Sequence, residues 1–142
     1  LRSGHYTSEK PIIIIAADTV VVSDGKILGK PATHEEAFDM ISAIQGKTHE
    51  VYTGVTIFFL ESKNGKPELT KRKTFSEMTQ VSVYPMTEAE IRAYADSEEP
   101  MDKAGAYGIQ GTFGKNIRGI HGDYTNVVGL PVGRVWNEIK EL

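Results

Sequence analysis

Four consecutive isoleucines at positions 12–15 constrain the fold more than any other stretch of the sequence. β-Branched side chains favour a pleated, packed surface, and the run is too short for a typical helix. It therefore predicts a strand, buried on both faces, that continues to about Val22. Asp18 interrupts the apolar run, and a carboxylate in such a place needs a partner for its charge. Two interpretations stay open: Asp18 accepts turn hydrogen bonds, or it belongs to a functional site.

A tight turn follows this strand. Residues 23–26 read Ser-Asp-Gly-Lys, and Gly25 can adopt the positive φ that a hairpin turn requires. The returning segment, residues 27–29, would bring Lys30 back to within a few ångströms of Asp18. Such a pair is either a plain ion pair or a site where the cation holds phosphate and the carboxylate handles metal or water.

The remaining pattern alternates helices with long strands. Thr33 and Thr87 are N-cap candidates, each with Glu three residues later, and Gly46 ends the first helix. Residues 49–60 and 69–84 predict two strands of one hairpin, with residues 49–60 central. Residues 102–111 read as a glycine-rich strand whose backbone approaches another strand or a ligand, and residues 119–128 as a final strand. The last helix follows Pro131, and its expected buried stripe consists of Val132, Val135, Trp136 and Ile139.

These elements predict an α/β domain with a mixed, strongly twisted sheet flanked by helices. With 142 residues, of which 39% are hydrophobic and 25% charged, the chain fits one globular domain. A net charge of −3 argues against a nucleic-acid partner but leaves room for a small anion in a local pocket. The absence of cysteine excludes disulfides and thiolate sites, and is compatible with the cytoplasm. No apolar run approaches the length needed to span a membrane. His49 has no second histidine at metal-ligand spacing, so it is expected to be a hydrogen-bonded structural residue.

Five motifs together carry a family resemblance: ADTVV, ILGKP, THEVYTGV, DKAGAYGIQG and YTNVVGLP. In this order they resemble the Maf family of nucleotide pyrophosphatases, from residue 12 to the C-terminus. The resemblance implies one Maf-like domain over residues 1–142, elongated and two-lobed like the inosine triphosphatases, with a cleft between the lobes. The family opens with a strand and a Ser-x-Arg-Arg turn that helps to hold the triphosphate, and residues 1–5, LRSGH, lack that pattern. We therefore expect a fragment that lacks this segment and is nearly inactive alone.

The resemblance also implies a function, the hydrolysis of nucleoside triphosphates to the monophosphate and pyrophosphate. Asp18 matches the general base of the family, and Lys30 matches the lysine of the GKP motif, which would hold phosphate oxygens. Thr19 and Gln110 match positions that separate substrate classes, and here they resemble the subfamily acting on dTTP and UTP, and modified pyrimidine nucleotides, rather than on 7-methyl-GTP. A glutamine amide offers donors and an acceptor to a pyrimidine edge. A divalent cation, Mg²⁺ or Mn²⁺, is expected to share the activation of water with Asp18, although the sequence identifies no further metal ligand.

Two other functions are kept as alternatives. One is a nucleotide-responsive regulatory module, suggested by the link of the family to septum formation in bacteria. The other is an inosine-triphosphate-type pyrophosphatase, which the motifs ADTVV and GIQG make less favoured. Asp18 separates the first from an enzyme, because a binding module tolerates its neutralisation and a hydrolase does not. The expected partner is a nucleoside triphosphate, with no nucleic acid and no membrane, and a homodimer is left open.

Overall fold

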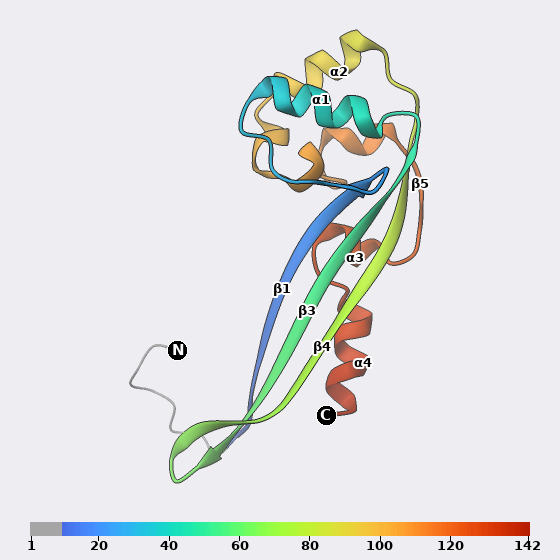
Figure 1. Cartoon of the computed structure of the whole chain (residues 1–142). Coiled ribbons are helices and arrows are strands. Elements are labelled where there is room, and N and C mark those ends of the chain that lie inside the picture. The colour runs from blue at the N-terminus through green and yellow to red at the C-terminus, as the bar shows by residue number, and fades with distance from the viewer. Residues whose placement is uncertain (1–9) are drawn as a thin grey trace.

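The computed structural model describes residues 10–142, so the expectations for the first nine residues lie outside the described part of the chain. A five-stranded sheet in the order β2-β1-β3-β4-β5 forms the long axis of the molecule (Figure 1). It contains β1 (Ile12–Ser23), β2 (Lys26–Leu28), β3 (Thr48–Lys63), β4 (Lys66–Val83) and β5 (Ile117–His121). The expected α/β domain, a sheet flanked by helices, is confirmed. The sheet is antiparallel rather than mixed, because all four strand pairings between residues 12 and 121 are antiparallel. No helix within residues 10–142 has the length and hydropathy needed to cross a bilayer.

Two tight turns set the registers of the hairpins. Asp24 and Gly25 join β1 to β2 with φ of 50° and 75°, and Asn64 and Gly65 join β3 to β4 with φ of 53° and 75°. Positive φ at both central residues matches the twist of antiparallel strands and is favoured by Asp-Gly and Asn-Gly. Both predicted hairpins are therefore confirmed, and β3 is central because it pairs with β1 and with β4.

The prediction that the isoleucine run is buried on both faces is wrong. Ile13 and Ile15 are 39% and 42% exposed, and residues 16–18 are exposed as well. The reason is the position of the strand: β2 pairs only with residues 21–23 of β1, and no strand within residues 10–142 pairs with the outer edge of residues 12–20. Burial on both faces needs covering layers and a central place in the sheet, and the first half of β1 has neither.

Helices α1 (His34–Ile44) and α2 (Glu88–Ala95) begin at the predicted caps. The hydroxyl of Thr33 accepts from the Glu36 N–H at 3.1 Å, and that of Thr87 accepts from the Glu90 N–H at 3.2 Å. Gly46, with φ of 65°, follows the end of α1 as predicted. The two helices lie side by side over one end of the sheet, together with the short 3₁₀ segments η1 (Glu99–Asp102), η2 (Ala104–Ala106) and η3 (Thr112–Asn116) (Figure 1).

This assembly, which we call the helical end, contains the largest core. Its buried members come from both helices, from η2 and η3 and from the end of β4. Phe113 is fully buried and lies with its ring centroid 5.0 Å from that of Tyr94 and 4.8 Å from that of Tyr107.

The opposite part of the sheet, which we call the hairpin end, runs toward the β3–β4 turn and is covered by α4 (Val132–Lys140) (Figure 1). Val135 packs there with Val55, Ile57 and Phe75. The predicted stripe of α4 is only partly right, because Val132 and Trp136 are 54% and 60% exposed. The helix is centred over β3 and β4, where Arg134 pairs with Glu77 at 3.2 Å. The side chains of Val132 and Trp136 therefore have no neighbouring layer to pack against.

Candidate functional site

A cavity of about 240 Å³ lies where the two ends of the molecule meet. Its floor is formed by β1 and β3, one wall by residues 103–111 and the other by residues 127–129. The lining residues are Thr19, Val21, Val51, Lys103, Ala104, Tyr107, Gly108, Ile109, Gln110, Gly111, Val127, Val128 and Gly129. The expected cleft between two lobes therefore exists, and it brings together Thr19 and Gln110 from distant parts of the sequence.

The first wall is not the glycine-rich strand that the sequence predicted. Gly105 and Ala106 have φ of 72° and 64°, which a strand cannot accommodate, and they lie in η2. The expected close approach is confirmed: a Cβ on Gly105 would lie 2.9 Å from Cγ1 of Val21, and the Gly105 N–H donates to the Gly29 carbonyl at 3.1 Å. Glycine is needed here because the wall rests directly on β1.

Gln110 stands at the rim of this wall, in a turn held by Glu99. The Glu99 carboxylate accepts from the Thr112 N–H and from the Thr112 hydroxyl, each at 2.8 Å. A Cβ on Gly111 would overlap that carboxylate, so the turn leaves no room for a side chain. Partial burial raises the pKa of Glu99, but the bonds from Thr112 outweigh it and leave the pKa below its ordinary value. The amide of Gln110 is exposed and has no hydrogen-bond partner within residues 10–142.

The second wall belongs to α3 (Tyr124–Val128), where the sequence predicted the last part of a strand. The strand β5 ends at His121, and Asp123 begins the helix by accepting from the Thr125 N–H at 2.8 Å and from its hydroxyl at 2.7 Å. Gly129, with φ of 136°, ends it. An Asp at the N-cap is a recognisable signal, but a helix of five residues is too short for a hydrophobic period to show.

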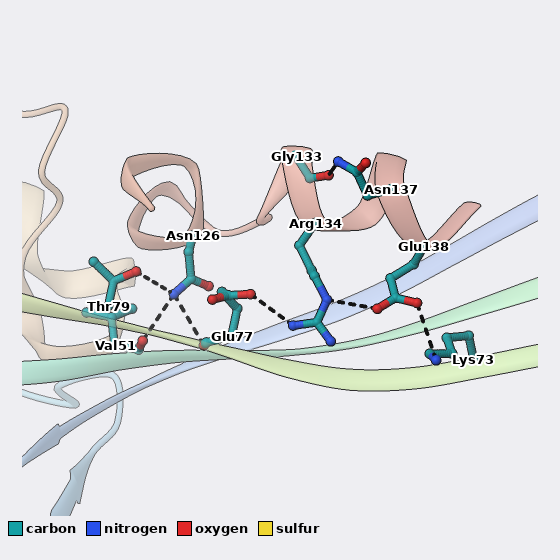
Figure 2. A network of polar contacts seen from close by, with 9 residues as sticks. All are labelled: Val51, Lys73, Glu77, Thr79, Asn126, Gly133, Arg134, Asn137 and Glu138. Carbon is teal, nitrogen blue, oxygen red and sulfur yellow. Dashed lines mark hydrogen bonds and ion pairs between the residues drawn. The ribbon is translucent and has the colours of Figure 1, made fainter. Parts of the chain in front are cut away.

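Asn126 fixes α3 to the sheet. Its side chain is fully buried, and Nδ2 donates to the Val51 carbonyl, the Glu77 carbonyl and the Thr79 hydroxyl at 3.2, 3.3 and 3.0 Å. Figure 2 shows the amide reaching β3 and β4 at the same time. Because the helix is short, these bonds to two strands, rather than its own hydrogen bonds, hold this wall of the cavity in place.

Thr19 reaches the cavity from β1 and is bonded to the floor beneath it. Its Oγ1 lies 2.9 Å from Oγ1 of Thr53, the residue opposite on β3, and 3.5 Å from the Gly129 carbonyl. Thr53 is fully buried and donates to the Asn126 carbonyl at 3.2 Å. A chain of hydroxyl groups therefore joins Thr19 to the wall formed by α3.

Asp18 and Lys30 do not line the cavity. The Asp18 carboxylate is exposed and accepts from the N–H of Thr19 at 3.0 Å. This is a local bond, as expected if Asp18 only accepts hydrogen bonds from its neighbours. No ion pair between Asp18 and Lys30 occurs within residues 10–142. The β1–β2 pairing stops at Leu28, and the Gly29 carbonyl bonds to η2 instead, so Lys30 is exposed. The pKa of Asp102 is lowered mainly by Lys103, and the charge of Lys30 adds a smaller contribution.

His49 is a structural residue, as expected. It is 1% exposed, and its Nε2 lies 2.6 Å from the Tyr107 hydroxyl, beside the first wall of the cavity. Burial lowers the pKa of His49 to about 4 and raises that of Tyr107, so both side chains are neutral at pH 7. The pair anchors the wall residue Tyr107 to β3.

The described residues contain no group of three or more His, Asp or Glu side chains placed to hold a metal ion. A site made of protein ligands alone is therefore not formed within residues 10–142. Mg²⁺ is commonly held by one or two carboxylates together with substrate phosphates, and the exposed Asp18 carboxylate fits that arrangement.

Three residues around the cavity were missed by reasoning from the sequence: Thr53, Glu99 and Tyr107. Each acts through a partner in another element, at least 13 residues away in the chain. The position of Thr53 in the sequence does not indicate which residue it contacts, although a polar residue within an apolar strand is a weak signal that it has a partner. Asn126 was expected on a strand that could line a polar cleft, and it lies on α3 instead.

Fold and cavity define an elongated α/β domain with a polar-rimmed pocket between its two ends. The family model described as Maf-like protein matches residues 2–142, so the chain belongs to the Maf family.

Curated relatives agree with this assignment. Over 141 residues the chain is 54% identical to a protein of Agathobacter rectalis named dTTP/UTP pyrophosphatase, covering 99% of this chain and 67% of that protein. Proteins of the same name from Carboxydothermus hydrogenoformans and Lachnoclostridium phytofermentans are 52% and 47% identical, over 91% and 94% of this chain and 66% of each relative. The chain thus spans about two thirds of the length of the curated relatives it matches.

Proposed function

We propose that this protein is a nucleoside triphosphate pyrophosphatase that hydrolyses dTTP and UTP to the monophosphate and pyrophosphate. The observation that carries the proposal is the meeting of Thr19 and Gln110 in one cavity. They come from different elements, and they are the positions whose family counterparts separate substrate classes. The names of the relatives support the same substrates.

The cavity would hold only part of the nucleotide. Its volume of about 240 Å³ is below the range of roughly 300–1,000 Å³ common for small-molecule sites. A base or sugar fits between the two walls, with Gln110 at the rim offering amide donors and an acceptor to a pyrimidine edge. The triphosphate would then extend from the cavity along β1 toward Asp18 and Lys30, which stand outside the lining.

In the proposed reaction the Asp18 carboxylate accepts a proton from a water molecule, whose oxygen attacks the α-phosphorus. The bond from that phosphorus to the bridging oxygen breaks, and the electron pair leaves with pyrophosphate. Lys30 neutralises charge on the phosphate oxygens. A divalent cation, Mg²⁺ or Mn²⁺, held by Asp18 and by phosphate oxygens, would supply further charge neutralisation.

The test is pyrophosphate release by the complete gene product from dTTP, UTP, ITP and 7-methyl-GTP, with and without divalent cation. We expect dTTP and UTP to be preferred, and Asp18→Asn to lower kcat by about 10²- to 10⁴-fold, the range for loss of a positioned base. Equal rates on all four nucleotides would contradict the substrate class. Near-normal turnover by Asp18→Asn would assign the base to another residue, and nucleotide binding without any turnover would favour the regulatory module.

Two further variants separate the roles of the charge and the amide. Lys30→Ala should lower kcat/KM for UTP and ITP alike, because a charge on phosphate does not sense the base. Gln110→Ala should reduce the preference for UTP over ITP by about 1–3 kcal/mol, since a base edge loses its partner. The reverse pattern would show that the roles are exchanged.

The proposal includes a cytoplasmic location, where these nucleotides are found, and leaves the homodimer to experiment. Sedimentation of the complete gene product with and without nucleotide would decide the oligomeric state.

A further inference from the structure

The hydroxyl groups beneath the cavity can be assigned a direction. Thr53 has one hydroxyl proton, and its bond of 3.2 Å to the Asn126 carbonyl uses it, because a carbonyl oxygen can only accept. The Thr19 proton then has two acceptors within reach, the Thr53 oxygen at 2.9 Å and the Gly129 carbonyl at 3.5 Å, and the much shorter distance assigns it to the Thr53 oxygen. The proton of Thr19 is therefore directed down into the floor.

The Asn126 carbonyl cannot turn away from Thr53, because the same residue is held at its side chain. The Thr79 hydroxyl donates to the Asp123 carbonyl at 3.0 Å, so its oxygen is free to accept from Asn126. The Val51 and Glu77 carbonyls can also only accept. All three neighbours therefore require the N–H side of the amide, which fixes both its orientation and the position of α3 (Figure 2).

Thr53 is fully buried and lies opposite Thr19 on neighbouring strands. The N–H of Thr19 bonds to the side chain of Asp18, so it points away from β3. Pairs that exchange no backbone bonds bring their side chains closest, which explains the short contact between the two hydroxyl oxygens.

From this chain of bonds we infer that Thr53 is a positioning residue that makes Thr19 a hydrogen-bond acceptor toward the cavity. The inference rests on the proposed function and refines it. With its proton committed to Thr53, the Thr19 oxygen can receive only an N–H or O–H group of the nucleotide. Uridine and thymidine nucleotides share two groups with this chemistry, the imide N3–H of the base and the 3′-hydroxyl of the sugar. Cytosine has an acceptor at N3, so it could not make that contact at the N3 position of its base.

Binding to uridine analogues tests this assignment. The dissociation constants of UMP, N3-methyl-UMP and 3′-deoxy-UMP would be measured calorimetrically with the complete gene product. Loss of the group facing Thr19 leaves its partly buried oxygen without a partner in the complex, so one of the two analogues should bind at least about tenfold more weakly than UMP. The weakened analogue identifies whether base or sugar reaches Thr19.

The variant Thr53→Val preserves the shape of the side chain and removes its hydroxyl. The Thr19 proton is then released, and the Gly129 carbonyl at 3.5 Å is too distant to hold it well. In Thr53→Val the weakened analogue should bind less than about threefold more weakly than UMP. In Thr53→Ser, which keeps the hydroxyl, the full penalty of about tenfold in affinity should remain. The matched control is Thr56→Val, which removes a similar hydroxyl contact of 3.0 Å, made with Thr74 of β4 on the exposed surface of β3, and should leave the penalty unchanged.

The outcomes separate the two levels of interpretation. If wild-type protein binds UMP but discriminates against neither analogue, or if Thr53→Val keeps the full penalty, the role of Thr53 is wrong and the proposed function stands. If wild-type protein binds no uridine nucleotide, the proposed function fails and the inference fails with it.

Discussion

The helical end and the hairpin end are built on the same three long strands, yet they are covered to different extents. At the helical end, two α-helices and three 3₁₀ segments close over the sheet, and aromatic rings fill the centre. At the hairpin end a single helix, α4, covers one face, and the isoleucines of β1 on that face stay two-fifths exposed. Similar apolar sequence therefore contributes different amounts of stability, according to the layer that lies opposite it.

The largest effect should come from the helical core. Phe113→Ala removes a fully buried ring packed between Tyr94 and Tyr107 and should lower the free energy of unfolding by about 3–5 kcal/mol. Trp136→Ala removes a larger ring from the hairpin end, but that side chain is 60% exposed, so the loss should stay below about 1 kcal/mol. Denaturant unfolding of both variants measures the contrast, and equal losses would show that Trp136 is buried in solution.

Acid should weaken the helical end selectively through His49. Its pKa is about 4 in the folded protein and 6.5 when unperturbed, so between these values the unfolded state binds more protons. Stability is thus complete above about pH 6.5 and declines as the pH falls toward 4. Between pH 7 and pH 5 the expected loss from this residue is about 2 kcal/mol.

The variant His49→Gln should lack this part of the acid dependence, whereas the exposed His121→Gln should keep it. Free energies of unfolding at pH 7 and pH 5 give the comparison. An identical pH dependence in His49→Gln and wild type would show that His49 is protonated in the fold.

The smallest predicted effect compares two isoleucines directly opposite each other. Ile57 of β3 is fully buried and Ile15 of β1 is 42% exposed, although they form a cross-strand pair on one face. Ile57→Val should cost about 0.5–1.5 kcal/mol, and Ile15→Val less than about 0.5 kcal/mol. A larger loss at Ile15 would mean that another layer covers the edge of β1 in the protein in solution.

The sequence predicted correctly the features that depend on neighbouring residues and wrongly those that depend on distant ones. The Asp24-Gly25 turn and the Thr33 and Thr87 caps were predicted correctly because neighbouring residues determine them. The burial of the isoleucine run and of Trp136 was predicted wrongly, because it depends on which element lies opposite.

The site shows the same division. Thr19 and Gln110 were found through motif resemblance, and the structure places both in the cavity. Thr53 was not found and Asn126 was placed on a strand, because a buried polar side chain reveals its role only through partners brought to it by the fold. The predicted approach of Lys30 to Asp18 assumed that the hairpin ladder continues past Leu28, where the chain instead turns to η2.

The central claim is that the cavity between the two ends is the nucleotide site. Titration of the complete, isotope-labelled gene product with UMP, followed by amide NMR shifts, tests it most directly. The predicted result is that shifts concentrate at the cavity residues Val51, Gly108, Gly111 and Gly129, while Gly65 in the distant β3–β4 turn stays unchanged. Saturable shifts confined to the hairpin end, with the cavity amides unmoved, would contradict it.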